Sequence, residues 1–171
     1  MLNKIFFVTG VCGVGKTTII SPLTSLLGVG FHVHDFDEEG VPNNVDRSWR
    51  LQKTQHWIDL GLQNLKKNIS TIICGFTKPD EVHHDCVVLI LLDAEKQTIE
   101  KRLWNRYQTP QSVSIIEKIT AKPVQKFIDD NVYYSSIMRD IAQKHNLKII
   151  DTTRLSPTQV ANEVAEYVMA Y

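Results

Sequence analysis

GVCGVGKTT, at residues 10–18, fits the pattern G-x-x-x-x-G-K-S/T without a departure and decides the fold of this chain. It follows the apolar run KIFFVT and precedes IISPLTSLLG, so it lies between a segment typical of a strand and one typical of a helix. Glycines let such a loop fold around an anion with its backbone N–H groups pointing inward, and the start of the next helix adds a positive dipole end. The stretch therefore predicts a loop that binds nucleotide phosphates.

Within this loop, Lys16 is expected to reach the β- and γ-phosphates, as a catalytic group, and the Thr17 hydroxyl is expected to ligate Mg²⁺. The residues that we predict to bind the nucleotide here are Gly10, Cys12, Gly13, Val14, Gly15, Lys16, Thr17 and Thr18.

Five short segments rich in β-branched and aromatic residues alternate with helical patterns along the chain. This alternation is typical of a parallel sheet covered by helices on both faces, so we predict one α/β domain over residues 1–171. The expected strands are residues 4–10, 31–37, 70–76, 87–93 and 147–151. The expected helices are 16–28, 46–67 with Asp46 as N-cap, 94–107, 114–121, 123–144 and 156–171, with a turn-like stretch at 108–114.

Composition narrows the range of partners. Lys and Arg number 19 and Asp and Glu number 19, so the chain has no net charge that would favour long nucleic acid or an anionic membrane. Its longest fully apolar run, residues 87–92, is far shorter than the roughly 20 residues of a membrane helix. The first residues lead directly into the first strand, so we expect no removable signal peptide. The three cysteines have no metal-type or redox-type spacing, which indicates reduced thiols in a cytoplasm.

An acidic pair, Asp35 and Asp37, ends the second predicted strand in HDFDEEG. Strand residues two apart point to the same face, so both carboxylates are expected at the carboxyl edge of the sheet, where open α/β sheets bind ligands. One carboxylate can help to hold Mg²⁺ and the other can accept the proton of an attacking hydroxyl. We predict Asp37 as the base and Asp35 as the metal-side and substrate-side partner, although the reverse assignment and a solvated acidic turn stay open.

Two other nucleotide-binding classes fit less well. The chain has no N-K-x-D guanine motif, as a switch GTPase would have. Asp93 at the end of the fourth strand is followed by Ala94, where motor and transporter ATPases usually place a water-orienting Glu.

Arg47 and Arg50 are three apart at the start of the helix after the acidic pair. They are expected to lie close together and to clamp a carboxylate or phosphate of the acceptor, with ordinary surface charge as the alternative for each.

GVCGVGKTT, the DFD after the second strand, the arginines of KRLWNR and the terminal IIDTTRLSPTQVANEV together resemble the small P-loop kinases of the shikimate, gluconate and nucleotide kinase group. The resemblance implies a three-layer α/β/α sandwich whose five-stranded parallel sheet has the order 2-3-1-4-5. It also implies ATP and Mg²⁺ as cofactors and a mobile helical lid at about residues 104–122.

The resemblance also implies roles for single residues. Asp37 would contact the acceptor hydroxyl, Arg102 would stack on adenine, and Arg106 would approach the phosphates as a catalytic group. Thr153 and Arg154 would line the adenine pocket. The third strand departs from the group because it ends in CGF, where relatives carry a glycine cluster or an Asp.

Three functions follow as alternatives. The first is phosphorylation of a small acceptor, such as a nucleoside, a nucleotide or a hydroxylated metabolite. The second is an ATP-binding sensor without turnover, and the third is a polynucleotide 5′-hydroxyl kinase, which the zero net charge disfavours. The sequence leaves the acceptor and the oligomeric state open.

Overall fold

Five parallel strands form one central sheet in the structure, a computed structural model that describes residues 4–171. Residues 1–3, on which the expected absence of a signal peptide partly depends, lie outside the described residues. The strand order β2-β3-β1-β4-β5 confirms the expected order 2-3-1-4-5. The strands are β1 (Ile5–Thr9), β2 (Phe31–Asp35), β3 (Ser70–Cys74), β4 (Val87–Asp93) and β5 (Lys148–Asp151).

Burial explains the composition of the strands. Every residue of β1 and of β3 is buried, which requires the near-continuous apolar runs that mark the interior of a parallel sheet. From β1 the chain first crosses to β2 on one side and later to β4 on the other. The carboxyl end of β1 therefore lies at the crevice where sheets of this kind bind ligands.

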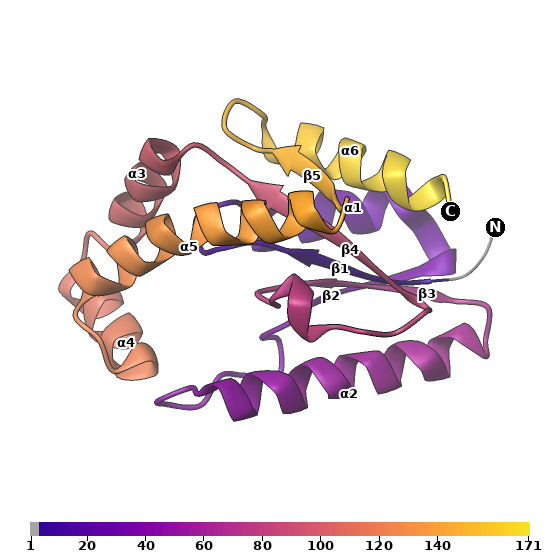
Figure 1. The fold of residues 1–171 in the computed structure, drawn as a ribbon, viewed down its shortest axis with the longest axis horizontal. Helices are drawn as coiled ribbons and strands as arrows, with labels where there is room; N and C mark the ends of the chain where they lie inside the picture. The colour runs from indigo at the N-terminus through magenta and orange to yellow at the C-terminus, as the bar shows by residue number, and fades with distance from the viewer. Residues whose placement is uncertain (1–3) are drawn as a thin grey trace.

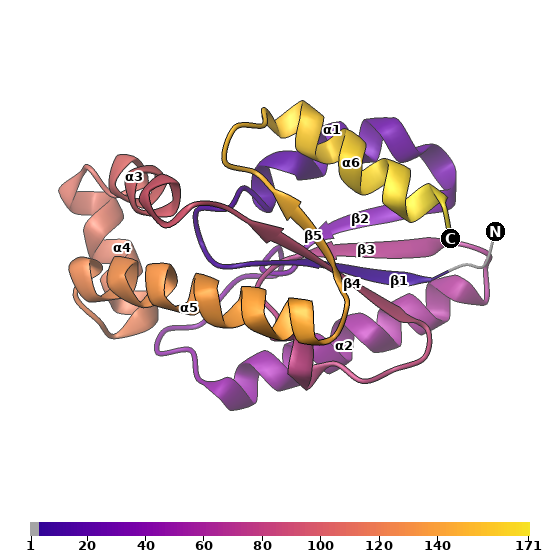
Figure 2. The same cartoon turned by 45° about the horizontal axis from the view of Figure 1, so that its top comes forward.

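Helices cover both faces of the sheet (Figures 1 and 2). On one face α1 and α6 pack against each other, with α1 on β2 and α6 on β5. On the other face α2 contacts β1 and β3, and α5 contacts β4 and β5. These helices are α1 (Ile20–Leu27), α2 (Arg47–Leu65), α5 (Val124–Lys144) and α6 (Pro157–Met169).

Two further helices, α3 (Lys96–Arg106) and α4 (Pro110–Thr120), lie beyond the carboxyl ends of the strands, at the left of Figure 1. Both contact α5. Three short 3-10 turns complete the described elements, namely η1 (Thr17–Ile19), η2 (Gly28–Gly30) and η3 (Pro79–Glu81).

Some expected boundaries are confirmed and others are wrong. Asp46 caps α2, since its Oδ1 accepts a 2.8 Å hydrogen bond from the Trp49 amide. The prediction of a turn-like stretch at 108–114 is wrong, because α4 already begins at Pro110. Thr109 and Ser112 form a capping box around that proline, which is well suited to the first helical position. The helix expected from residue 16 begins as η1 and becomes α-helical only at Ile20.

No helix within residues 4–171 is both long and apolar enough to cross a membrane.

Candidate active site

The glycine loop joins β1 to η1 and takes backbone conformations that other residues rarely adopt. Gly10 and Gly13 have φ angles of 150° and 91°. A Cβ atom on Gly10 would lie 2.4 Å from the Leu92 carbonyl oxygen, and one on Gly13 would lie 3.2 Å from the Ile99 carbonyl oxygen. Glycine is therefore required here for the loop to pack against β4 and α3.

Lys16 is buried beneath this loop with 9% of its surface exposed. Its ammonium donates 2.8 Å hydrogen bonds to the carbonyl oxygens of Gly10 and Val11. Burial is the main influence on the pKa of Lys16 and lowers it; the nearby Arg106 also lowers it, whereas Asp37 raises it. The structure thus brings Arg106 and Asp37 each within electrostatic reach of Lys16.

A cavity of about 290 Å³ opens beside the glycine loop. Arg102 is anchored at its wall, because its guanidinium donates to the Gly13 carbonyl (3.2 Å) and to the Thr152 hydroxyl (3.1 Å) and carbonyl (2.7 Å). The lining residues are Gly13, Gly15, Thr18, Ile19, Arg102, Arg106, Leu155, Pro157 and Val160. Five of these residues, namely Gly13, Gly15, Thr18, Arg102 and Arg106, are among those predicted for the nucleotide site. Leu155, Pro157 and Val160, from α6 and the loop before it, add an apolar side to the cavity.

Thr153 and Arg154 line a neighbouring cavity that shares Leu155 with the first. The Thr153 hydroxyl accepts from the Glu95 amide at 2.9 Å, and the Thr153 amide donates to the Asp151 carboxylate at 2.8 Å. Their contact with adenine stays a prediction.

The acidic pair does not lie along one strand as expected, because β2 ends at Asp35 and Asp37 lies in the turn that follows. Phe36 is fully buried, and Asp37 follows it in the turn. The two aspartates are nevertheless held together, since the Asp37 amide donates to Asp35 Oδ1 at 2.9 Å. Gly75 makes this possible, because a Cβ atom on it would lie 2.0 Å from Phe36 Cβ.

Asp37 faces Arg50 of α2 across 3.5 Å between Oδ1 and a terminal guanidinium nitrogen. Within residues 4–171, both of these atoms are buried and neither has a hydrogen-bond partner. Burial raises the pKa of Asp37, and the Arg50 guanidinium opposes that rise in part. The two groups form an ion pair, and each keeps unused hydrogen-bonding capacity that a ligand group beside the pair could satisfy.

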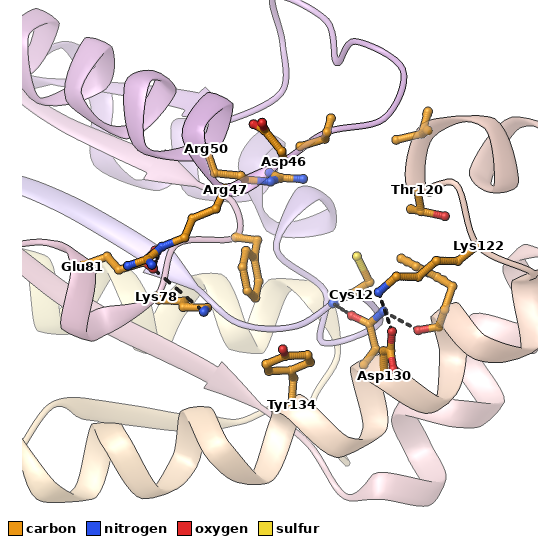
Figure 3. Close-up of a pocket in the computed structure, with 15 residues that line it drawn as sticks. Cys12, Asp46, Arg47, Arg50, Lys78, Glu81, Thr120, Lys122, Asp130 and Tyr134 are labelled. Carbon is orange, nitrogen blue, oxygen red and sulfur yellow. Dashed lines mark hydrogen bonds and ion pairs between the residues drawn. The ribbon is translucent and has the colours of Figure 1, made fainter.

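A second cavity, of about 330 Å³, opens next to Arg50 between α2, η3, α4 and α5 (Figure 3). Arg47 donates to Glu81 at 2.9 Å, Lys78 lies 3.8 Å from the same carboxylate, and Lys122 donates to Asp130 at 2.7 Å. Arg47 and Arg50 thus both line this cavity, but Arg47 pairs with Glu81. The lining residues are Cys12, Val45, Asp46, Arg47, Arg50, Phe76, Lys78, Glu81, Ile119, Thr120, Lys122, Phe127, Asp130, Asn131 and Tyr134.

Two contacts tie remote segments together around this cavity. The Val45 amide, in the loop before α2, donates to the Ile119 carbonyl at the end of α4 at 3.3 Å. The Asn131 side chain of α5 accepts from the Cys12 amide of the glycine loop at 2.8 Å. The expected lid region therefore touches the acceptor side of the molecule, and α5 touches the phosphate side.

The residues that sequence reasoning missed are those that long-range packing supplies to the two cavities. Glu81, Asn131 and Tyr134 carry no local motif, and no spacing in the chain relates them to the glycine loop.

Asp93, at the end of β4, is only 6% exposed, and its carboxylate forms an ion pair with Arg139 of α5. This ion pair supplies a structural reason for a carboxylate at the end of β4.

A metal site made by the protein alone is not found among the described residues, where no three His, Cys, Asp or Glu side chains are grouped to hold an ion. Mg²⁺ in nucleotide sites usually takes one or two protein oxygens and completes its shell with phosphates and water. The Thr17 hydroxyl and the Asp35 carboxylate have the right chemistry for such a site, and their role as ligands stays a prediction.

Comparison with known proteins adds an independent line of evidence. The sequence is 28% identical over 151 residues to a probable gluconokinase of Dictyostelium discoideum, covering 75% of this chain and 76% of that protein. The structure matches that of a shikimate kinase from Acinetobacter baumannii in complex with shikimate, with a TM-score of 0.56, 14% identity and coverage of 98% and 94%. It also matches a sugar kinase from Janibacter sp., with a TM-score of 0.54, 18% identity and coverage of 98% and 95%. No protein-family model matches the sequence.

These likenesses support a small P-loop kinase of the shikimate and gluconate kinase group. The complete phosphate-loop motif, the strand order and the gluconokinase relative agree on this point. The cavity beside the glycine loop and the acidic turn lie at the same carboxyl edge of the sheet, as the resemblance leads one to expect.

Proposed function

We propose that this kinase transfers the γ-phosphoryl group of ATP, bound with Mg²⁺, to a hydroxyl of a small hydroxylated acid such as a sugar acid. The observation that carries the proposal is the buried, unbonded pair formed by Asp37 Oδ1 and the Arg50 guanidinium within residues 4–171. A hydroxyl beside this ion pair would donate to Asp37 and accept from Arg50. Such a hydroxyl would be close to the glycine loop, because the field of Asp37 reaches Lys16.

The charge of the acceptor cavity supports an acceptor with a single negative charge. Four cationic side chains line the cavity against three carboxylates, and Arg47, Lys78 and Lys122 are engaged by Glu81 and Asp130. The fourth cation, Arg50, is shared with Asp37 at 3.5 Å, and one shared cation suits one carboxylate better than the dianionic phosphate of a nucleotide. The gluconokinase relative supports the same class of acceptor.

The chain's own groups account for binding and proton transfer. The loop amides and Lys16 bind the phosphates, and Lys16 then exchanges its bonds to Gly10 and Val11 for phosphate oxygens. Asp37 takes the proton of the attacking hydroxyl, for which its raised pKa makes it a stronger base than an ordinary aspartate. Arg106, in the last turn of α3, stabilises charge on the transferred group.

Mg²⁺, held by Thr17 and through water by Asp35, would neutralise charge on the β- and γ-phosphates. Arg102 and Thr18 would hold the rest of the nucleotide in the cavity beside the loop. We further propose that residues 104–122 act as the lid, since α4 reaches the acceptor side through Ile119.

The test is an acceptor screen with γ-labelled ATP over D-gluconate, other sugar acids, shikimate, nucleosides and nucleoside monophosphates, with and without Mg²⁺. We expect Mg²⁺-dependent transfer to a sugar acid. Asp37→Asn should keep ATP binding and lower kcat by about 10²–10⁴-fold, the usual contribution of a general base. Asp59→Asn, on the exposed part of α2, is the matched control and should behave as the wild type.

Three outcomes would contradict the proposal. Near-normal turnover of Asp37→Asn would remove it as the base. Tight ATP binding without turnover on any acceptor would favour a sensor, and salt-sensitive binding of oligonucleotides would favour a polynucleotide kinase.

A further inference from the structure

Glu38 forms a bridge inside the acidic turn that the mechanism above does not use. Its Oε2 accepts a 3.1 Å hydrogen bond from the Asp35 amide, and its own amide donates to the Asp35 carbonyl at 3.1 Å. Asp35 in turn accepts from the Asp37 amide at 2.9 Å. The pattern is that of a capping box, in which a carboxylate three residues later returns to the first amide. Glu38 therefore closes the turn in which Asp35 and Asp37 are joined.

The second oxygen of Glu38 is held by His34 of β2. Oε1 lies 2.8 Å from His34 Nδ1, and a carboxylate has only acceptors, so the imidazole carries its proton on Nδ1. The His34 ring packs on Trp57 with 5.0 Å between ring centroids. Trp57 is 1% exposed, and its indole N–H donates to the Phe36 carbonyl at 3.1 Å. The core under α2 thus fixes His34, and His34 orients Glu38.

Glu39 offers a contrast within the same turn. Its carboxylate pairs outward with Lys53 and His56 of α2, and its side chain is 54% exposed. It makes none of the hydrogen bonds that hold Asp35 or Asp37. Glu38 and Glu39 are adjacent and carry the same charge, but only Glu38 is hydrogen-bonded to Asp35.

We propose that Glu38 is a positioning residue for phosphoryl transfer. Its carboxylate, oriented by His34, holds the Asp35–Asp37 turn so that Asp37 faces the acceptor hydroxyl. The inference rests on the proposed function, because it assigns to Glu38 the placement of the base that the proposal names. Without Glu38 the Asp35 amide loses its acceptor and the turn relaxes, and a shift of about 1 Å in a reacting group lowers turnover by about 100-fold.

The experiment compares two substitutions at each member of the network. Glu38→Ala removes both bonds, whereas Glu38→Gln keeps an oxygen for the Asp35 amide. His34→Phe keeps the ring on Trp57 and loses the Nδ1 donor, whereas His34→Asn loses the ring and keeps an N–H donor. Glu39→Ala is the matched control for loss of a carboxylate from the turn.

Turnover is followed as ADP release from Mg²⁺ and ATP with D-gluconate, or with water as acceptor if D-gluconate is not phosphorylated. We expect Glu38→Ala to lower kcat by about 10- to 100-fold with little change in the KM for ATP. Glu38→Gln should recover most of that loss, and His34→Phe should fall between them with His34→Asn closer to the wild type. Glu39→Ala should keep kcat. Hydrogen exchange of the Asp35 amide should quicken in Glu38→Ala and not in Glu39→Ala.

The results separate this inference from the proposed function. If Asp37→Asn abolishes turnover while Glu38→Ala keeps kcat, the inference fails and the proposed base stands. If Glu39→Ala costs as much as Glu38→Ala, the effect is a general loosening of the turn and the inference also fails. If Asp37→Asn keeps turnover, the proposed function fails first.

Discussion

Gly75 connects the packing of the sheet to the placement of the proposed base. A Cβ atom on Gly75 would lie 2.0 Å from Phe36 Cβ and 2.7 Å from Phe36 Cγ. Carbon atoms in contact lie about 3.5–4.0 Å apart, so Gly75→Ala must move Phe36 by roughly 1.5 Å. Phe36 is fully buried between Asp35 and Asp37, so the shift is carried to both carboxylates.

Two magnitudes follow from this displacement. Overpacking of a well-packed core costs about 1–3 kcal/mol of stability, which for a chain of this length lowers the melting temperature by about 2–12 °C. Misplacement of Asp37 by an ångström or more lowers kcat by about 100-fold, while the KM for ATP changes little because the glycine loop is untouched.

Differential scanning calorimetry and steady-state kinetics test both effects. Gly30→Ala is the control, because no heavy atom lies within 4 Å of its Cβ position and its φ is ordinary. That variant should melt at or slightly above the wild-type temperature, since alanine reduces the entropy of the unfolded chain. The reasoning is refuted if Gly75→Ala matches Gly30→Ala in both melting temperature and kcat.

Other expectations concern titration, thiols and the ion pair at β4. Burial raises the pKa of Asp37, and the base acts in its ionised form. As the pH is lowered, kcat/KM should therefore begin to fall at a higher pH than it would with an ordinary aspartate as the base. A profile that stays flat down to pH 4 contradicts this expectation. The same shift disfavours the ionised form in the folded state, so Asp37→Asn should melt no lower than the wild type at pH 7. Burial raises the pKa of Cys74 to about 12, so iodoacetamide at pH 8 should label Cys12 and Cys86 before Cys74. Bound ATP should slow the labelling of Cys12. Peptide mass spectrometry measures the order in which the three thiols are labelled. Arg139→Ala leaves the carboxylate of Asp93 unpaired and should lower the free energy of unfolding by about 1–3 kcal/mol, seen in urea titration, without changing the KM for ATP.

Local signals account for the parts of the fold that were predicted from the sequence. Apolar runs reveal β1 and β3 because buried parallel strands need them, and Asp46 reveals the start of α2 because a free amide there needs an acceptor. The strand order came from the family resemblance. The glycine loop was found because three of its positions need backbone angles that favour glycine.

The errors arose where two local signals competed. Thr109 and Pro110 are typical of a turn and equally of a helix start, and the capping box with Ser112 decides for the helix. Alternation along β2 suggested a strand through Asp37, but the turn closed by Glu38 stops it at Asp35. The partners of Arg47 and Arg50 depend on η3 and on the acidic turn, and helical spacing alone contains neither.

The hydrogen bond between Val45 and Ile119 uses only main-chain atoms. Substitution of either residue by any residue except proline therefore leaves both bonding groups in place. Both side chains line the cavity next to Arg50, so a substitution reshapes that cavity while the link between its two walls stays. A change in the ligand preference of this cavity can therefore arise at these two positions without loss of the contact between α4 and the loop before α2.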